Sequence, residues 1–105
     1  MSQFDLYANP DKQTQKTYPY FVDIQNDLLD SLNSRFVIPL TPVPRADKIY
    51  PDNLCPVIII AGKTYALLTQ QMATVAVVVL KNKAGSLAEY RTRIIAAVDF
   101  LIAGI

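Results

Sequence analysis

Apolar and polar positions divide the chain up to residue 81 into short strand-like segments. Residues 3–7 alternate apolar and polar with period two, and the other segments are short runs rich in apolar and β-branched side chains. Two runs on either side of Ala61-Gly62-Lys63 predict a hairpin. The run at 74–81 is apolar almost throughout, which predicts a buried, central strand. The predicted strands are 3–7, 18–25, 36–40, 56–60, 64–68 and 74–81.

The connections between these segments are also marked in the sequence. Residues 8–17 are polar and carry the turn signal Asn9-Pro10-Asp11, so we expect a mobile loop. Residues 41–53 contain three prolines and predict an irregular connection. Between the second and third strands, Asp27-Leu28-Leu29-Asp30 places two large aliphatic side chains between acids.

Residues 87–105 predict one amphipathic helix that runs to the last residue of the sequence. Ser86 as N-cap and Glu89 three residues later form a capping box. An apolar stripe suited to covering a sheet follows at three- and four-residue spacing: Leu87, Tyr90, Ile94, Val98 and Leu101. Ile95 and Phe100 lie off this stripe and Ile102 extends it. The helix is therefore apolar on more than one face, and we expect a partner on the second face.

These elements predict one domain of the mostly-β, α+β class over residues 1–105. Roughly five to seven strands with short connections favour antiparallel pairing. A small SH3-like barrel with a long C-terminal helix fits this order of elements best. The chain is 51% hydrophobic and 18% charged, which is typical of a folded protein and leaves apolar surface for self-association.

Composition narrows the available chemistry. The net charge is +1 and the basic residues are scattered, whereas nucleic-acid binders usually show a basic stripe. The sequence has no histidine, which removes the commonest general base and the commonest metal ligand. The single cysteine, Cys55, is interpreted as a small buried side chain rather than a reactive thiol. No glycine-rich phosphate loop or metal-ligand spacing is present, so no cofactor or metal is expected.

Two further patterns suggest catalysis but are better explained by structure. The acids around Leu28 and Leu29 are better explained as solvated or capping residues than as a hydrolase pair. The segment Arg45-Ala46-Asp47-Lys48 has groups suited to phosphodiester cleavage, but prolines 42 and 44 favour a solvated loop. The longest apolar run, 75–80, is too short to cross a membrane, and residues 1–17 show no signal-peptide pattern. We therefore expect a soluble, cytoplasmic protein without a membrane partner.

Several segments in order along the chain resemble the CcdB family of bacterial toxins. They are Gln3–Tyr7, Phe21–Asp30, Arg35–Leu40, Leu54–Ile58, Leu68–Ala73 and the final Gly104-Ile105. The resemblance implies the barrel-and-helix fold shared with MazF toxins, a homodimer, and no catalysis. It also implies a toxin that binds the A subunit of DNA gyrase and traps the enzyme on cleaved DNA. A CcdA-type antitoxin with a disordered tail would neutralise it, and the two together would bind operator DNA and repress their operon.

The resemblance assigns gyrase contact to particular positions. Gly104 and Ile105 match the family's C-terminal tail, but Ala103 stands where its best-known form has tryptophan. Leu28 and Leu29 match an aliphatic pair that contacts gyrase, although a place in the core is an equal alternative for them. Asp99 and Ile102 complete the predicted gyrase-binding set. Packing within the dimer is the alternative role for Ile102 and Ile105.

Two other functions compete with gyrase poisoning. Ala103 supports a degenerate homologue that keeps antitoxin binding and has lost toxicity, because tryptophan is a frequent interface hot spot. A MazF-type endoribonuclease would share the barrel but would need a basic cleft and an acid–base group. The scattered charge and the missing histidine disfavour that activity.

Overall fold

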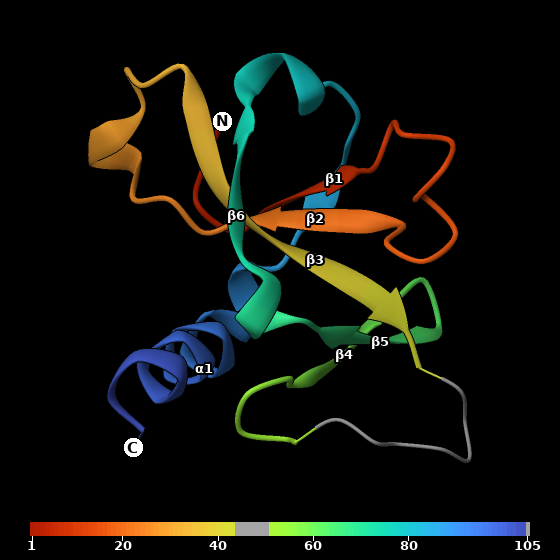
Figure 1. Ribbon diagram of the computed structural model, residues 1–105, viewed down its shortest axis with the longest axis vertical. Helices are drawn as coiled ribbons and strands as arrows, with labels where there is room; N and C mark the ends of the chain where they lie inside the picture. The colour runs from red at the N-terminus through yellow and green to blue at the C-terminus, as the bar shows by residue number, and fades with distance from the viewer. Residues whose placement is uncertain (44–50, 105) are drawn as a thin grey trace.

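The computed structural model describes residues 1–43 and 51–104. In these residues one α-helix follows seven strands, with short 3-10 turns between them (Figure 1). The strands are β1 Asp5–Ala8, β2 Tyr20–Asp23, β3 Ser34–Pro42, β4 Val57–Ile60, β5 Lys63–Leu67, β6 Ala73–Ala76 and β7 Lys83–Ser86. The 3-10 turns are η1 Asp27–Leu29, η2 Thr69–Gln71, η3 Val77–Val79 and η4 Ala88–Tyr90, and the helix is α1 Arg91–Ala103.

The strands form a single antiparallel sheet in the order β4-β5-β3-β2-β1-β7, with β6 paired to β3 off this path. The nine-residue β3 connects the sheet, because it pairs with β6 near its start, β2 in the middle and β5 at its end. In this register Val22 lies opposite Ile38, and Leu40 lies opposite Leu67. The sheet curls as a half-barrel, so the predicted mostly-β barrel with a C-terminal helix is confirmed.

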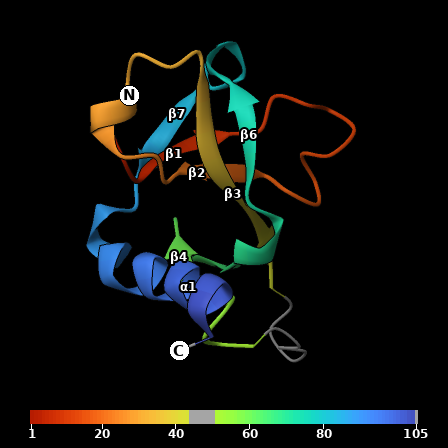
Figure 2. The same ribbon diagram turned by 60° about the vertical axis from the view of Figure 1, so that its left-hand side comes forward.

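The main core lies between the concave side of the sheet and α1 (Figure 2). Its buried side chains are Phe4, Leu6, Val22, Ile38, Leu40, Ile58, Tyr65, Leu67, Leu87 and Ile94. Tyr7, Val37 and Leu80 form a smaller cluster, in which Tyr7 and Val37 alternate along β1 and β3 with Leu6 and Ile38 of the main core. Because neighbouring side chains of a strand point to opposite faces, Leu6 and Tyr7 enter different clusters.

The predicted central strand at 74–81 is wrong. Strand β6 ends at Ala76, and the chain turns through η3 at Val77–Val79. The Val78 side chain is 70% exposed, whereas Leu80 is buried. β-branched residues favour extended backbone, but they do not determine how many neighbours a strand finds. Strand β7 was not predicted, because Lys-Ala-Gly-Ser has no apolar alternation and pairs with β1 through its backbone.

The predicted start of the helix is also corrected. The α-helix begins at Arg91, after the separate turn η4. Ser86 Oγ accepts the N–H of Ala88 at 3.2 Å, so Ser86 stabilises the turn and does not cap α1. The stripe buries Leu87 and Ile94, with Ala97 added, but Leu101 is 40% exposed and lies outside the core. Gly104 ends the helix in the left-handed conformation at φ +74°.

Candidate functional site

Turn η1 holds two of the predicted gyrase-binding side chains in solvent. Leu28 is 90% exposed and Leu29 is 50% exposed, so the alternative that they belong to the core is wrong. Asn26 begins the turn, and its Oδ1 accepts the N–H of Leu28 at 2.8 Å. The N–H of Asp30 donates to the carbonyl of Asp27 and closes the turn. The leucines are therefore exposed on a turn whose backbone is hydrogen-bonded at both ends.

A buried arginine lies behind this turn. The Arg35 side chain is fully buried, and its Nε donates to Oδ2 of the equally buried Asp23 at 2.8 Å. Arg35 Nη1 donates to Asp30 Oδ1 at 2.9 Å, and Nη2 donates to the carbonyl of Gln25 at 3.3 Å. The Asp27 carboxylate lies 3.9 Å from Nη2. One guanidinium thus contacts the chain before, within and after the turn.

Gln25 gives the turn a second attachment. Its Nε2 donates to the carbonyl of Leu29 at 3.0 Å, and its Oε1 accepts the N–H of Phe36 at 3.1 Å. The side chain therefore joins η1 directly to β3. Burial raises the pKa of the Asp23 carboxyl, and the hydrogen bond and positive charge of Arg35 partly oppose that rise. Arg35 therefore stabilises the ionised form of the buried Asp23.

The end of α1 carries the remaining predicted residues. The Ile102 side chain is 77% exposed, and Asp99, Ala103 and Gly104 are also exposed. The N–H of Gly104 donates to the carbonyl of Phe100 at 2.9 Å, which closes the last turn of the helix. Ile105 lies outside the described residues. This end therefore presents apolar surface on a backbone-bonded helix terminus.

The structure does not bring the two sets of residues together within one chain. Figures 1 and 2 show η1 (orange) and the last turn of α1 (dark blue) at opposite ends of the molecule in both views. Leu28 and Leu29 therefore form one surface, the turn surface. Asp99, Ile102, Ala103 and Gly104 form another, the helix-end surface.

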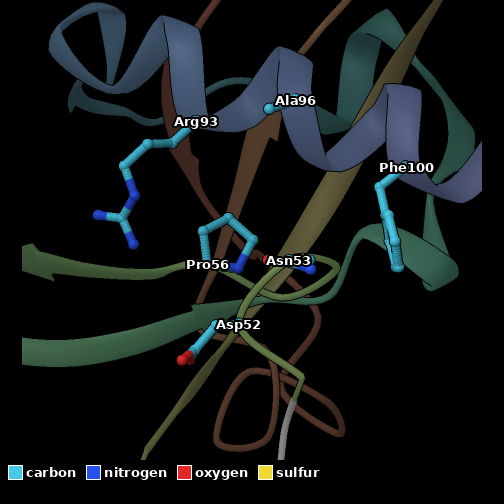
Figure 3. Close-up of a pocket in the computed structure, with 6 residues that line it drawn as sticks. All are labelled: Asp52, Asn53, Pro56, Arg93, Ala96 and Phe100. Carbon is cyan, nitrogen blue, oxygen red and sulfur yellow. The ribbon is translucent and has the colours of Figure 1, made fainter. Parts of the chain in front are cut away.

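A cavity that the sequence did not predict lies beside α1. Its volume is about 590 Å³. Figure 3 shows Arg93 and Phe100 pointing from the helix toward the segment that precedes β4. The lining residues are Asp52, Asn53, Pro56, Arg93, Ala96 and Phe100. An arginine, an aspartate and an aromatic ring around an open hollow offer both apolar and charged contacts.

The remaining expectations from the sequence concern Cys55, metal ligands and the segment Arg45–Lys48. Cys55 is fully buried, and its Sγ donates to Gln70 Oε1 at 3.1 Å. Burial raises the pKa of this thiol, as expected for an inert side chain. Over residues 1–43 and 51–104, no group of three potential ligands is placed to hold a metal ion. The segment Arg45–Lys48 lies outside the described residues.

No helix in the part of the chain that the structure describes has the length and apolarity needed to cross a membrane. The structure is a small half-barrel domain whose exposed apolar side chains include those of the turn surface and the helix-end surface. The family model described as CcdB protein matches residues 3–104. The chain therefore belongs to the CcdB family, the toxins of toxin–antitoxin modules.

Proposed function

We propose that this protein binds the A subunit of DNA gyrase and holds the enzyme on cleaved DNA. The supporting observation is the exposure of the positions to which the family resemblance assigns gyrase contact. Leu28 is 90% exposed and Ile102 is 77% exposed, although large aliphatic side chains are usually buried. Side chains left in solvent at these two places are available to a partner protein.

The proposed mechanism requires binding and no catalysis. A ligand shifts an equilibrium only by its differential affinity for the two states. A toxin that binds the cleaved gyrase–DNA complex more tightly than the religated one therefore accumulates broken DNA. The chain lacks histidine, and such an action needs neither a general base nor a metal. This function belongs to the bacterial cytoplasm, where gyrase acts on DNA.

We also propose that the active form is a homodimer. The turn surface and the helix-end surface lie far apart in one chain, and Leu101 and Ile102 leave part of α1 uncovered. A two-fold dimer presents each surface twice and gives the uncovered part of the helix an apolar partner. The dimer then carries two copies of the turn surface and two copies of the helix-end surface.

The proposed regulator is a CcdA-type antitoxin. A disordered tail that folds on binding wraps a large surface and is readily displaced or degraded, which suits a neutralising partner. We propose that the antitoxin covers the toxin and removes it from gyrase. Together the two proteins bind operator DNA and repress their operon, and the toxin does not bind that DNA alone. If the operon lies on a plasmid, this control serves plasmid maintenance.

One alternative has a specific observation behind it. Ala103 is exposed at the last residue of α1, at the position where the best-known family form has tryptophan. A protein without that anchor would retain the fold and antitoxin binding but would not poison gyrase. The endoribonuclease alternative is disfavoured by the scattered basic residues and the missing histidine. The segment Arg45–Lys48 lies outside the described residues.

Plasmid cleavage by purified gyrase tests the proposal. Reactions contain gyrase, ATP, supercoiled plasmid and increasing amounts of the folded protein, and they are stopped with detergent and protease. We expect linear DNA in proportion to added protein, and none without gyrase. Absence of linear DNA with folded protein would favour the non-toxic homologue. Degradation of total RNA in a parallel incubation would instead indicate an endoribonuclease.

A further inference from the structure

We propose that Arg35 is a positioning residue that fixes turn η1 so that Leu28 is presented to gyrase. This inference rests on the proposed function, because it assigns Arg35 a role in the same binding event. Arg35 itself is fully buried and cannot touch a partner. It acts through the turn surface, and Asp30 and Gln25 complete the connection.

The geometry supports a role in holding the turn. Arg35 stands on β3 and binds Asp23 at the end of β2, so it is anchored between two paired strands. From that anchor the guanidinium reaches the carbonyl of Gln25 on one side of the turn and Asp30 on the other. A planar guanidinium fixes several acceptors in one arrangement, which a lysine cannot reproduce. The turn is thereby tied to the most extensively paired strand of the sheet.

A buried arginine is not an effective means of stabilising a core. Well-packed apolar side chains often stabilise as much as a buried ion pair or more, because desolvation of both charges is costly. The contact with Asp30 is peripheral, since the Asp30 side chain is 57% exposed, and exposed ion pairs contribute little to stability. The clear structural effect of the contact between Arg35 and Asp30 is to close the segment that carries Leu28 and Leu29.

A fixed turn has a direct consequence for binding. An exposed leucine on a free loop must be ordered when it binds, and this ordering weakens the complex. In η1 the backbone is already held by Asn26, Gln25 and Arg35, so Leu28 reaches its partner in one conformation. Arg35 therefore raises affinity for gyrase without contacting it.

Asp30→Ala is the appropriate test, because Arg35 variants leave Asp23 buried without a partner and endanger the fold. The matched control is Asp11→Ala, which also removes an exposed, hydrogen-bonded carboxylate, in this case one that accepts the N–H of Gln13. Leu28→Ala and the double variant Leu28→Ala/Asp30→Ala complete a cycle. For each protein we measure the dissociation constant for the gyrase A subunit and amide hydrogen exchange at residues 28–30.

We expect Asp30→Ala to weaken gyrase binding about three- to tenfold, the cost of ordering one or two side chains. Amide exchange in η1 should accelerate, while Asp11→Ala leaves both the affinity and η1 exchange unchanged. In the Leu28→Ala background, Asp30→Ala should cause no further loss of affinity, because the leucine side chain that the turn positions is already absent.

The other outcomes overturn the inference in distinguishable ways. If Leu28→Ala weakens binding but Asp30→Ala changes neither affinity nor exchange, the positioning role is wrong and the proposed function stands. If Asp30→Ala weakens binding equally in both backgrounds, Asp30 contacts gyrase directly and the positioning role is again wrong. If Leu28→Ala binds gyrase like the unmodified protein, the turn surface is not a gyrase contact and both assignments fail.

Discussion

The turn surface and the helix-end surface both expose large apolar side chains, but the protein holds them by different means. Behind Leu28 lies a network of buried side chains in which Arg35 joins two strands to the turn. Behind Ile102 lies only the helix backbone, ended by the left-handed Gly104. Side-chain contacts from three segments hold the first surface, and hydrogen bonds between neighbouring turns hold the second.

The difference shows that exposure and rigidity are separate properties. Leu28 is more exposed than Ile102, at 90% against 77%, and yet the turn that carries Leu28 is more extensively connected to the core than the end of the helix is. Replacements near η1 should therefore affect both stability and binding. Replacements at the helix end should affect binding alone.

The largest expected effect is the difference in stability between a variant behind the turn surface and a variant on the helix-end surface. Arg35→Met leaves Asp23 buried and unpaired, and removal of one partner from a buried pair costs about 3–5 kcal/mol. Ile102→Ala should change the free energy of unfolding by less than about 0.5 kcal/mol, as exposed positions usually do. Urea unfolding at equal protein concentration measures both. A cost above about 1 kcal/mol for Ile102→Ala would show that Ile102 packs against a second copy.

Removal of Gly104 and Ile105 should distinguish the helix-end surface from the turn surface by its effect on activity. The helix ends at Ala103, so the truncated chain should keep its fold, its dimer and its antitoxin binding. Loss of an interface hot spot of at least about 2 kcal/mol corresponds to roughly thirtyfold weaker gyrase binding. Plasmid cleavage and a bacterial growth assay report the loss of toxicity, and circular dichroism checks the fold. Full toxicity in the truncated protein would exclude a role for these two residues.

A smaller effect in the opposite direction is expected from Ala103→Trp. A tryptophan at this exposed position adds a large apolar side chain beside Ile102, and we expect about tenfold more cleavage at equal protein concentration. Ala96→Trp is the matched control, since Ala96 is exposed on the same helix. If the unmodified protein is not toxic, Ala103→Trp should create toxicity. Equal cleavage by all three proteins would show that residue 103 does not contact gyrase.

The last expected effect is absent at neutral pH and concerns the depth of the network behind η1. Burial and the nearby carboxylates of Asp5 and Asp23 raise the pKa of Tyr7 to about 12. The unfolded chain ionises this phenol near pH 10.0, so the contribution of Tyr7 to stability should be fully present below that pH and be lost as pH rises toward 12. Burial also raises the pKa of Tyr65, so ultraviolet titration should show late phenolates, one of which Tyr7→Phe removes. Titration of Tyr7 near pH 10.0 would contradict its burial.

Local signals were sufficient for much of the fold. The hairpin around Ala61-Gly62-Lys63, the strand at 36–40 and the single helix at the end are all confirmed. The segment at 74–81 was predicted wrongly, because its apolar composition does not say whether neighbours cover it. Strand β7 depends on backbone pairing with β1, for which Lys-Ala-Gly-Ser carries no side-chain pattern.

The candidate site was predicted only in part for a related reason. The resemblance identified the exposed leucines and the helix end, although the apolar pattern alone left Leu28 and Leu29 equally suited to the core. The network behind them was missed. Asp23, Asp30 and Arg35 are separated in sequence and meet only because β2 and β3 pair with Asp23 opposite Val37. A lone arginine among acids before a strand was the available signal, and its burial could not be read from the sequence.

The pairing of β1 with β7 determines when the protein becomes complete. Asp5 lies opposite Ser86, and the carbonyl of Phe4 accepts the N–H of Leu87 at 2.7 Å. Strand β1 must therefore wait until β7 has been synthesised before its second edge is paired. Contacts between such distant segments slow folding, since a long loop must close first. The sheet is thus incomplete until β7 is synthesised, whereas β2 and β3, whose residues hold η1, are already present by then.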